Sequence, residues 1–153
     1  MGDVIEPRLA SRRTSWASSP GVRRSMQSNK SRDTTVEVRL RSALYRSGLR
    51  FRKNVRPIPG LRCSADVVFP RWRVAVFVDG CYWHSCPIHR TTPKTNADWW
   101  AAKLSSTVAR DATSRRALER EGWTVIQVWE HEDVSFAVTK VLAALEAASR
   151  NRI

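Results

Sequence analysis

The sequence is short of three things: long apolar runs, cysteines and acidic side chains. No apolar run approaches the ~20 residues that a transmembrane helix needs, and the N-terminus lacks the hydrophobic core of an export signal. We therefore expect a cytoplasmic protein with no membrane partner. The chain contains three cysteines, which argues against a disulfide scaffold and fits a reducing compartment.

The shortage of acidic side chains leaves a large positive charge. There are 27 Lys and Arg residues against 14 Asp and Glu, a formal net charge of +13. The first 56 residues contain 14 basic and 4 acidic side chains, a net charge of +10. A basic surface binds nucleic acid through its phosphates, so nucleic acid is the expected partner. A charged tail that only improves solubility is the alternative.

A chain of 153 residues has enough material for one domain with a core. Residues 1–25 are rich in Ser, Arg and Pro and have little apolar periodicity, which predicts a flexible basic arm. A single domain is expected to follow at residues 26–153, and no internal repeat is visible in it.

Apolar periodicity and turn residues predict the elements of this domain. A helix begins at the capping box of Thr34 and Glu37 and ends at Gly48. A long helix begins near residues 96–98 and ends at Gly122. Strands are predicted at residues 49–53, 65–69, 73–78 and 123–129, and a last helix at residues 135–148. The second and third strands form a hairpin.

Cysteine and histidine gather directly after the strand predicted at residues 73–78. Cys81, Cys86 and His89 supply three ligands at a spacing that suits tetrahedral zinc. His131 follows another apolar run and would complete the shell if the two strands lie side by side. Four protein ligands leave no open position for water, which indicates a structural zinc ion. His84 is left unbound inside this loop and is the first candidate for chemistry.

Five motifs occur in the order found in one known family. They are RDTTVE at residues 32–37, the strand ADVVF at 65–69, VFVDGCYWH at 76–84, PKTNADWWAAK at 93–103 and GWTVIQVWE at 122–130. With these motifs the chain resembles the very-short-patch-repair (Vsr) endonucleases over about residues 22–134. The resemblance implies an α/β, restriction-endonuclease-like core of the PD-(D/E)XK type. In such a core, helices flank a mixed central sheet, and here zinc would stabilise a loop.

The resemblance also implies an activity. Vsr endonucleases use Mg²⁺ to nick double-stranded DNA on the 5′ side of the mispaired T in a T:G mismatch, which repairs deaminated 5-methylcytosine. MutL-type mismatch repair proteins are implied as partners, and a monomer is expected because nicking one strand needs one active centre. Two alternatives stay open: a zinc-stabilised DNA-binding module without catalysis, and a restriction-type endonuclease that acts on unmispaired sites.

Catalytic roles follow from the family pattern position by position. Asp66 matches the aspartate that coordinates the catalytic Mg²⁺, and His84 matches the general base toward the attacking water. Glu37 matches a glutamate that approaches the site, although helix capping explains this residue equally well. Asp79 stands where the best-known member has a histidine that assists catalysis. A carboxylate at this position could bind magnesium together with Asp66.

The family's structural zinc maps to the four ligands named above, two of which are histidines where that member has cysteines. Tyr82, Trp83 and Trp100 match aromatic side chains that wedge into the duplex beside the mismatch. Met26 matches a residue inserted from the opposite groove. Inserting rings between base steps costs less at a mispaired step, which gives selectivity. The alternative for Tyr82 and Trp83 is that they only cover the zinc site.

Overall fold

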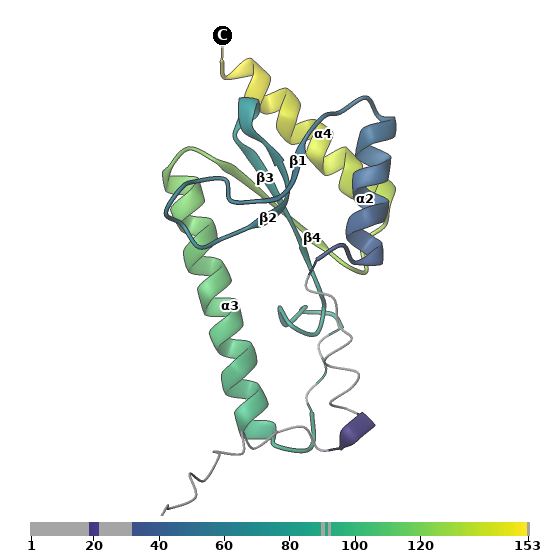
Figure 1. Ribbon diagram of the computed structural model, residues 1–153, viewed down its shortest axis with the longest axis vertical. Coiled ribbons are helices and arrows are strands. Elements are labelled where there is room, and N and C mark those ends of the chain that lie inside the picture. The colour runs from purple at the N-terminus through teal and green to yellow at the C-terminus, as the bar shows by residue number, and fades with distance from the viewer. Residues whose placement is uncertain (1–18, 22–31, 90, 92, 153) are drawn as a thin grey trace, which may run out of the picture. The chain divides into compact units, whose positions relative to one another are not determined.

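The computed structural model describes residues 19–21, 32–89, 91 and 93–152 of the chain. It has a mixed α/β fold in which helices cover both faces of a four-stranded sheet of order β1-β2-β3-β4 (Figure 1). In chain order the elements are helix α2 (Thr35–Arg46), strands β1 (Arg52–Val55) and β2 (Ala65–Phe69), the 3₁₀ helix η1 (Pro70–Trp72), strand β3 (Val74–Asp79), helix α3 (Ala97–Arg120), strand β4 (Thr124–Trp129) and helix α4 (Val134–Arg150).

The directions of the strands decide which strand ends meet. The pairs β1/β2 and β2/β3 are antiparallel, whereas β3 and β4 run parallel. The start of β2 therefore lies beside the end of β3, and the end of β4 lies on the other side of β3. This topology brings Asp66, Asp79 and the segment that follows Trp129 to the same end of the sheet.

Different helices cover the two faces of the sheet. Side chains alternate along a strand, so Val76 and Phe77 of β3 point to opposite faces. On one face Val76 packs in a core with Leu40 of α2 and Val141 of α4. On the other face Phe77 packs in a second core with Leu118 of α3. The central strand β3 is thus buried on both sides, which explains why it is apolar at nearly every position.

The predicted helices and strands are all found, with shifts at their ends. The largest shift is in the first strand, predicted at residues 49–53 and found at Arg52–Val55. Leu49 and Phe51 suggested a strand because they are apolar, but they lie ahead of it and pack against the core. β3 begins one residue late because Arg73 adopts a left-handed conformation (φ 52°) after the 3₁₀ helix of the hairpin.

Two predictions fall largely outside the described residues. The flexible arm predicted at residues 1–25 and its boundary at residue 26 lie outside the described residues, apart from residues 19–21. The division into arm and domain therefore stays a prediction.

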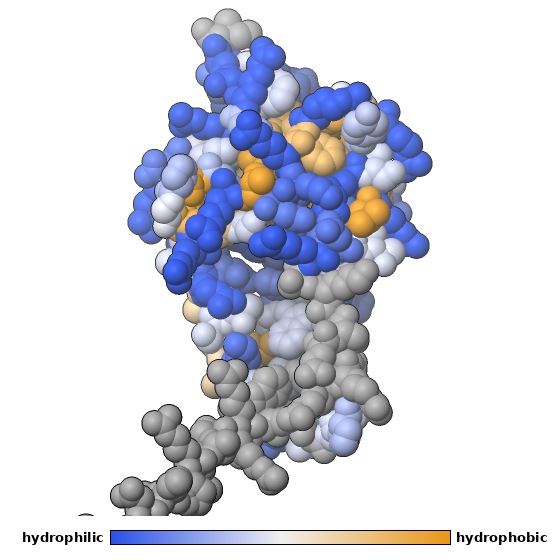
Figure 2. All heavy atoms as spheres, in the orientation of Figure 1, coloured by the Kyte–Doolittle hydropathy of each residue, from blue (hydrophilic) through white to orange (hydrophobic). Residues whose placement is uncertain are grey.

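Among the described helices, none combines the length and the apolar character that a membrane span requires. On the face drawn in Figure 2, hydrophilic side chains form most of the described surface.

Candidate active site and metal centre

Asp66 lies near the start of β2 and is partly buried. Its Oδ2 accepts a hydrogen bond from the backbone N–H of Val78 at 2.6 Å, which ties the carboxylate to β3. Burial, together with the charges of Glu37 and Asp79, raises the pKa of Asp66 to about 6 in spite of this hydrogen bond. An ionised carboxylate that is destabilised in this way is stabilised when a cation binds to it.

Glu37 is buried at the start of α2 and forms the predicted capping box. The Thr34 hydroxyl accepts a hydrogen bond from the Glu37 N–H, and the Glu37 carboxylate accepts one from that hydroxyl. Its Oε2 also accepts from the Asp33 N–H at 2.8 Å and lies 3.5 Å from Arg41 Nη1. Capping and the ion pair with Arg41 therefore account for the contacts of Glu37. The charge of Glu37 is also one of the causes that raise the pKa of Asp66.

Asp79 ends β3 and is 3% exposed. Arg115 of α3 donates through Nη2 to both of its oxygens, at 2.8 and 2.6 Å. Gln127 of β4 donates to Oδ2 at 2.6 Å. The two carboxylate oxygens therefore accept three hydrogen bonds from protein donors. The magnesium-binding role predicted for Asp79 stays a prediction. A magnesium ion would have to compete with these hydrogen bonds for the carboxylate oxygens.

His84 lies between two carboxylates. Its Nδ1 is 2.5 Å from Oδ2 of Asp111 in α3 and 3.7 Å from Oδ1 of Asp79. Burial alone would lower the pKa of His84, but the hydrogen bond to Asp111 and the charges of Asp79 and Asp111 raise it. The same hydrogen bond lowers the pKa of Asp111 against the effect of burial. Asp111 thus remains ionised and orients the imidazole ring.

The structure links the predicted catalytic residues through Asp79. The Asp79 carboxylate lies beside His84, and its charge also acts on Asp66 from the neighbouring strand. The end of the sheet therefore carries a carboxylate that can take a hard cation and an imidazole that can take a proton. These are the two tasks that hydrolysis of a phosphodiester requires.

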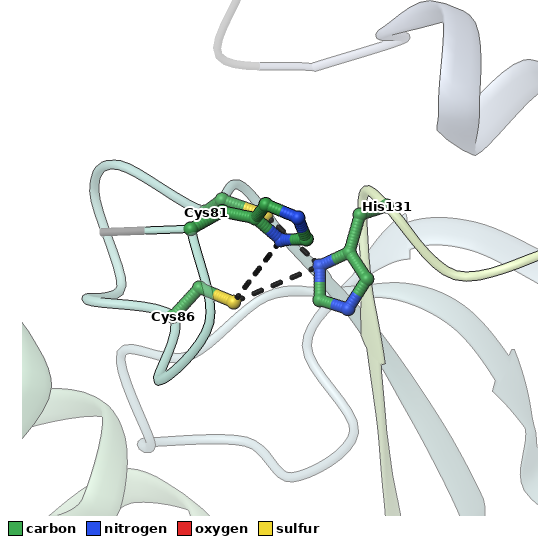
Figure 3. A group of neighbouring side chains, drawn as sticks. Cys81, Cys86 and His131 are labelled. Atoms are coloured by element: carbon green, nitrogen blue, oxygen red, sulfur yellow. Dashed lines mark hydrogen bonds between the residues drawn. The ribbon is translucent and has the colours of Figure 1, made fainter. Parts of the chain in front are cut away.

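The four predicted metal ligands lie together. The ligand atoms of Cys81, Cys86, His89 and His131 all lie within 4.8 Å of one another. His131 Nδ1 is 3.1 Å from the Cys81 sulfur and 3.6 Å from the Cys86 sulfur, and these side chains point toward one another in Figure 3. Tetrahedral zinc holds sulfur and nitrogen ligands about 3.3–3.8 Å apart. The group can therefore hold a metal ion of this kind.

Strand pairing explains how His131 reaches the loop. Because β3 and β4 are parallel and Asp79 pairs with Trp129, the segments that follow the two strands leave the sheet side by side. The Glu130 N–H donates to the Asp79 carbonyl at 2.9 Å. In return, the Glu130 carboxylate accepts from the Cys81 N–H at 2.8 Å. The expectation that the two segments lie side by side is confirmed.

Burial and the neighbouring Cys86 sulfur raise the pKa of Cys81 to about 11. Burial opposes the ionisation of Cys86 as well, but the backbone N–H groups of His89 and Ile88 lower its pKa. Since a metal binds thiolates, metal binding must release protons from this group.

The predicted DNA-wedging rings form a cluster. Tyr82 packs edge-to-face on Trp83 and on Trp100, with ring centroids 5.2 and 5.7 Å apart. Trp99 packs edge-to-face on Trp100 at 4.9 Å. Tyr82 and Trp83 are partly exposed, whereas Trp100 is 8% exposed and Trp99 38%. Trp100 therefore lies beneath the other rings. Met26 lies outside the described residues.

Three side chains of the site were not assigned by sequence reasoning: Asp111, Arg115 and Gln127. Asp111 and Arg115 are four residues apart on α3, so they lie on one face of this helix. Their spacing with opposite charge is common on solvated helices, and only the packing of α3 shows that this face meets the site. Gln127 carried one signal, a polar residue in the apolar strand WTVIQVW.

The family model and the relatives that match this chain all point to one family. The family model of the DNA mismatch endonuclease Vsr matches residues 20–90. The type II nicking enzyme V.NaeI of Lentzea aerocolonigenes is 44% identical over 127 residues, which cover 82% of this chain and 76% of the relative. The type II nicking enzyme V.XorIIP of Xanthomonas oryzae is 40% identical over 128 residues, which cover 82% and 87%. The DNA mismatch endonuclease Vsr of Escherichia coli is 35% identical over 109 residues, which cover 70% and 67%.

Proposed function

The chain belongs to the Vsr family of DNA endonucleases, and on that premise we propose that it nicks double-stranded DNA on the 5′ side of the mispaired T in a T:G mismatch. The reaction is hydrolysis of one phosphodiester bond. It leaves 3′-hydroxyl and 5′-phosphate ends and starts the repair of deaminated 5-methylcytosine. The observation that carries this proposal is that one end of the sheet holds both the partly buried carboxylate of Asp66 and the Asp79 carboxylate, beside which His84 lies with its hydrogen bond to Asp111.

Asp66 is the proposed magnesium ligand. Among the described carboxylates at this end of the sheet, Glu37 is paired with Arg41 and Asp79 with Arg115, whereas Asp66 forms no ion pair. Oxygen ligands suit Mg²⁺, and the burial that raises the pKa of Asp66 disfavours its ionised form, which a bound cation would stabilise. When bound, the ion would neutralise the charge that develops on the phosphate oxygens.

His84 is the proposed general base. An imidazole whose Nδ1–H is donated to Asp111 has Nε2 as its acceptor, and this nitrogen can take the proton of the attacking water. The ionised Asp111 stabilises the imidazolium that forms. Because Asp111 holds the ring by a short hydrogen bond, His84 does not have to be oriented anew for each turnover.

We assign a structural zinc ion to Cys81, Cys86, His89 and His131, in keeping with the PD-(D/E)XK-type core and zinc loop implied for the family. Four protein ligands leave no position for a metal-bound nucleophile. The ion would clamp the loop that carries His84, because the sulfurs lie three residues before it and two residues after it in the sequence. The loop has few apolar side chains of its own that could replace this clamp.

Tyr82, Trp83 and Trp100 are proposed to find the mismatch by inserting rings between base steps, helped by Met26 from the opposite groove. Tyr82 and Trp83 are partly exposed and would enter first. Trp100 would support them or follow when the cluster opens. The cost of unstacking is lower at a mispaired step, which converts the weakness of that step into selectivity.

The remaining parts of the proposal concern the whole protein. The basic arm at residues 1–25 would add phosphate contacts to a single catalytic domain at residues 26–153. The protein would act as a monomer, and MutL-type mismatch repair proteins are the proposed partners.

The test is a set of matched duplexes that contain T:G, T:A or C:G at one position, incubated with Mg²⁺ and resolved on denaturing gels. We expect one nick, 5′ to the mispaired T, in the T:G duplex only. Asp66→Ala and His84→Ala should each remove it. Full activity in either variant would contradict the mechanism. Binding without nicking in any divalent ion would favour the non-catalytic module, and equal cutting of the paired duplexes would favour a restriction-type enzyme.

A further inference from the structure

We propose that Arg115 is a positioning residue of the active site: together with Gln127 it holds the Asp79 carboxylate away from His84, so that Asp111 is the carboxylate that orients this base. The inference rests on the proposed role of His84 as general base. The inference gives a function to the ion pair between Arg115 and Asp79, which has no part in the catalytic roles proposed above.

The first support is the competition between two carboxylates for one imidazole nitrogen. His84 Nδ1 is 2.5 Å from Asp111 and 3.7 Å from Asp79, so Asp111 has the hydrogen bond and Asp79 lies just beyond hydrogen-bonding distance. A small rotation of either side chain would reverse this choice. A base that pairs with Asp79 would turn its Nε2 away from the position that Asp111 gives it, and general-base catalysis is sensitive to such displacements.

The second support is the way in which Asp79 is restrained. Arg115 Nη2 donates to both oxygens, at 2.8 and 2.6 Å, and Gln127 donates to Oδ2 at 2.6 Å. These donors come from α3 and β4, two elements that both pack against β3. The Arg115 guanidinium is itself held 4.9 Å from the centroid of the Phe77 ring. Asp79 therefore has a fixed position that does not depend on His84.

The third support is that one helix, α3, carries both the carboxylate that binds His84 and the guanidinium that binds Asp79. Asp111 and Arg115 lie one turn apart on α3, so the residue that binds His84 and the residue that binds Asp79 move together. Stability alone does not explain the pair. A buried ion pair is weak evidence of stabilisation, and the Nε of Arg115 is buried without a hydrogen-bond partner among the described residues.

A consequence for the metal follows. With three hydrogen bonds on its two oxygens, Asp79 serves as an anchor and not as a ligand of the catalytic ion. Mn²⁺ can replace Mg²⁺ as a probe and be counted by electron paramagnetic resonance, without reference to activity. Asp79→Asn should bind Mn²⁺ at the DNA-bound site as the wild type does, whereas Asp66→Asn should lose this binding. Loss of Mn²⁺ in Asp79→Asn would overturn the anchor role.

The main test compares Arg115→Met with the double variant Arg115→Met/Asp79→Asn at saturating T:G duplex in single turnover. Arg115→Met frees Asp79 to compete for His84, and the nicking rate should fall about 10- to 100-fold with little change in DNA affinity. The double variant removes the competing charge as well, and its rate should return to within about fivefold of the wild type. A double variant as slow as Arg115→Met would overturn the proposal, because the guanidinium would then act on the substrate directly.

A spectroscopic readout separates this inference from the proposed function. The chain has three histidines, and His89 and His131 belong to the metal group, so a downfield imidazole N–H signal bonded to a carboxylate reports on His84. The signal should change in Arg115→Met and return in the double variant. This holds even if the wild type fails to nick DNA, which would refute only the proposed function. An unchanged signal and rate in Arg115→Met would refute the positioning role.

Two further variants complete the design. Arg116→Met removes the same charge from the next, exposed position of α3 and should leave the rate within about twofold and the imidazole signal unchanged. If Arg115→Met does not fold, Gln127→Leu removes one donor from Asp79 and keeps the ion pair. It should show a smaller loss in the same direction and the same change of the signal; no change in either would count against the proposal.

Discussion

The end of the sheet and the loop that follows β3 hold their functional side chains by different forces. Asp66 and Asp79 belong to strands whose apolar side chains are buried on both faces. In the loop, Cys81 and Cys86 are buried, while Ile88 is 74% exposed. Packing and strand register thus position Asp66, the proposed magnesium ligand, whereas metal ligation would fix the loop that carries His84, the proposed base. The proposed mechanism would need both regions, whereas we expect the fold to need only the first.

The largest expected effect belongs to Asp66→Asn, because a metal ion supplies several kcal/mol of charge stabilisation. Nicking should fall at least about 1000-fold. The variant should also be more stable than the wild type, since the pKa of Asp66 in the folded protein, about 6, lies above the ordinary value of 3.8. Ionisation of Asp66 therefore removes stability as the pH rises from about 4 through about 6.

Above pH 6 and without metal, the free energy of unfolding of Asp66→Asn should therefore exceed that of the wild type by up to about 3 kcal/mol. Below pH 4 the two proteins should unfold alike, as measured by urea denaturation across this range. A wild type that is more stable than Asp66→Asn at pH 8 without divalent ions would contradict this account of the site.

The second effect separates the two regions directly. Cys86→Ala removes a fully buried metal ligand, so zinc content should drop and nicking should fall about 100-fold or more as His84 loses its place. The circular dichroism of the helices and sheet should persist. Cys63→Ala is the matched control, since Cys63 lies outside the metal group and should keep both zinc and activity. Global unfolding of Cys86→Ala would show that the two regions are not independent.

A third variant acts on the sheet region alone. Leu44 of α2 is completely buried in the core, and Leu44→Ala should lower the free energy of unfolding by about 2–5 kcal/mol. Zinc content and the nicking rate at 25 °C should stay close to wild type while the protein remains folded. If zinc were lost together with stability in urea titrations, packing would be supporting the loop after all.

The smallest effect is the pH dependence of the base. The nicking rate should rise with pH, because only the neutral His84 can accept a proton, and its midpoint should lie above the ordinary imidazole pKa of 6.5. Asp111→Asn weakens the hydrogen bond that raises this pKa, so the midpoint should move down. Rate profiles of both proteins at saturating DNA measure the shift; an unchanged midpoint would show that Asp111 does not act on His84.

Much of the fold could be predicted because its signals are local. The capping box at Thr34 and Glu37 and the apolar run of β3 each depend on residues close in sequence. The first strand was misplaced because Leu49 and Phe51 pack against the core without forming a strand, and an apolar pattern does not distinguish the two cases.

The candidate site divides in the same way. The sequence by itself determined which atoms are available: two thiols and two imidazoles at ligand spacing, a carboxylate at the head of β2, and a histidine left over for chemistry. Only the tertiary structure decided the pairings, His84 with Asp111 and Asp79 with Arg115. The physical reason is that these contacts join residues 27 and 36 positions apart through the packing of α3 against the sheet, and no local spacing encodes that packing.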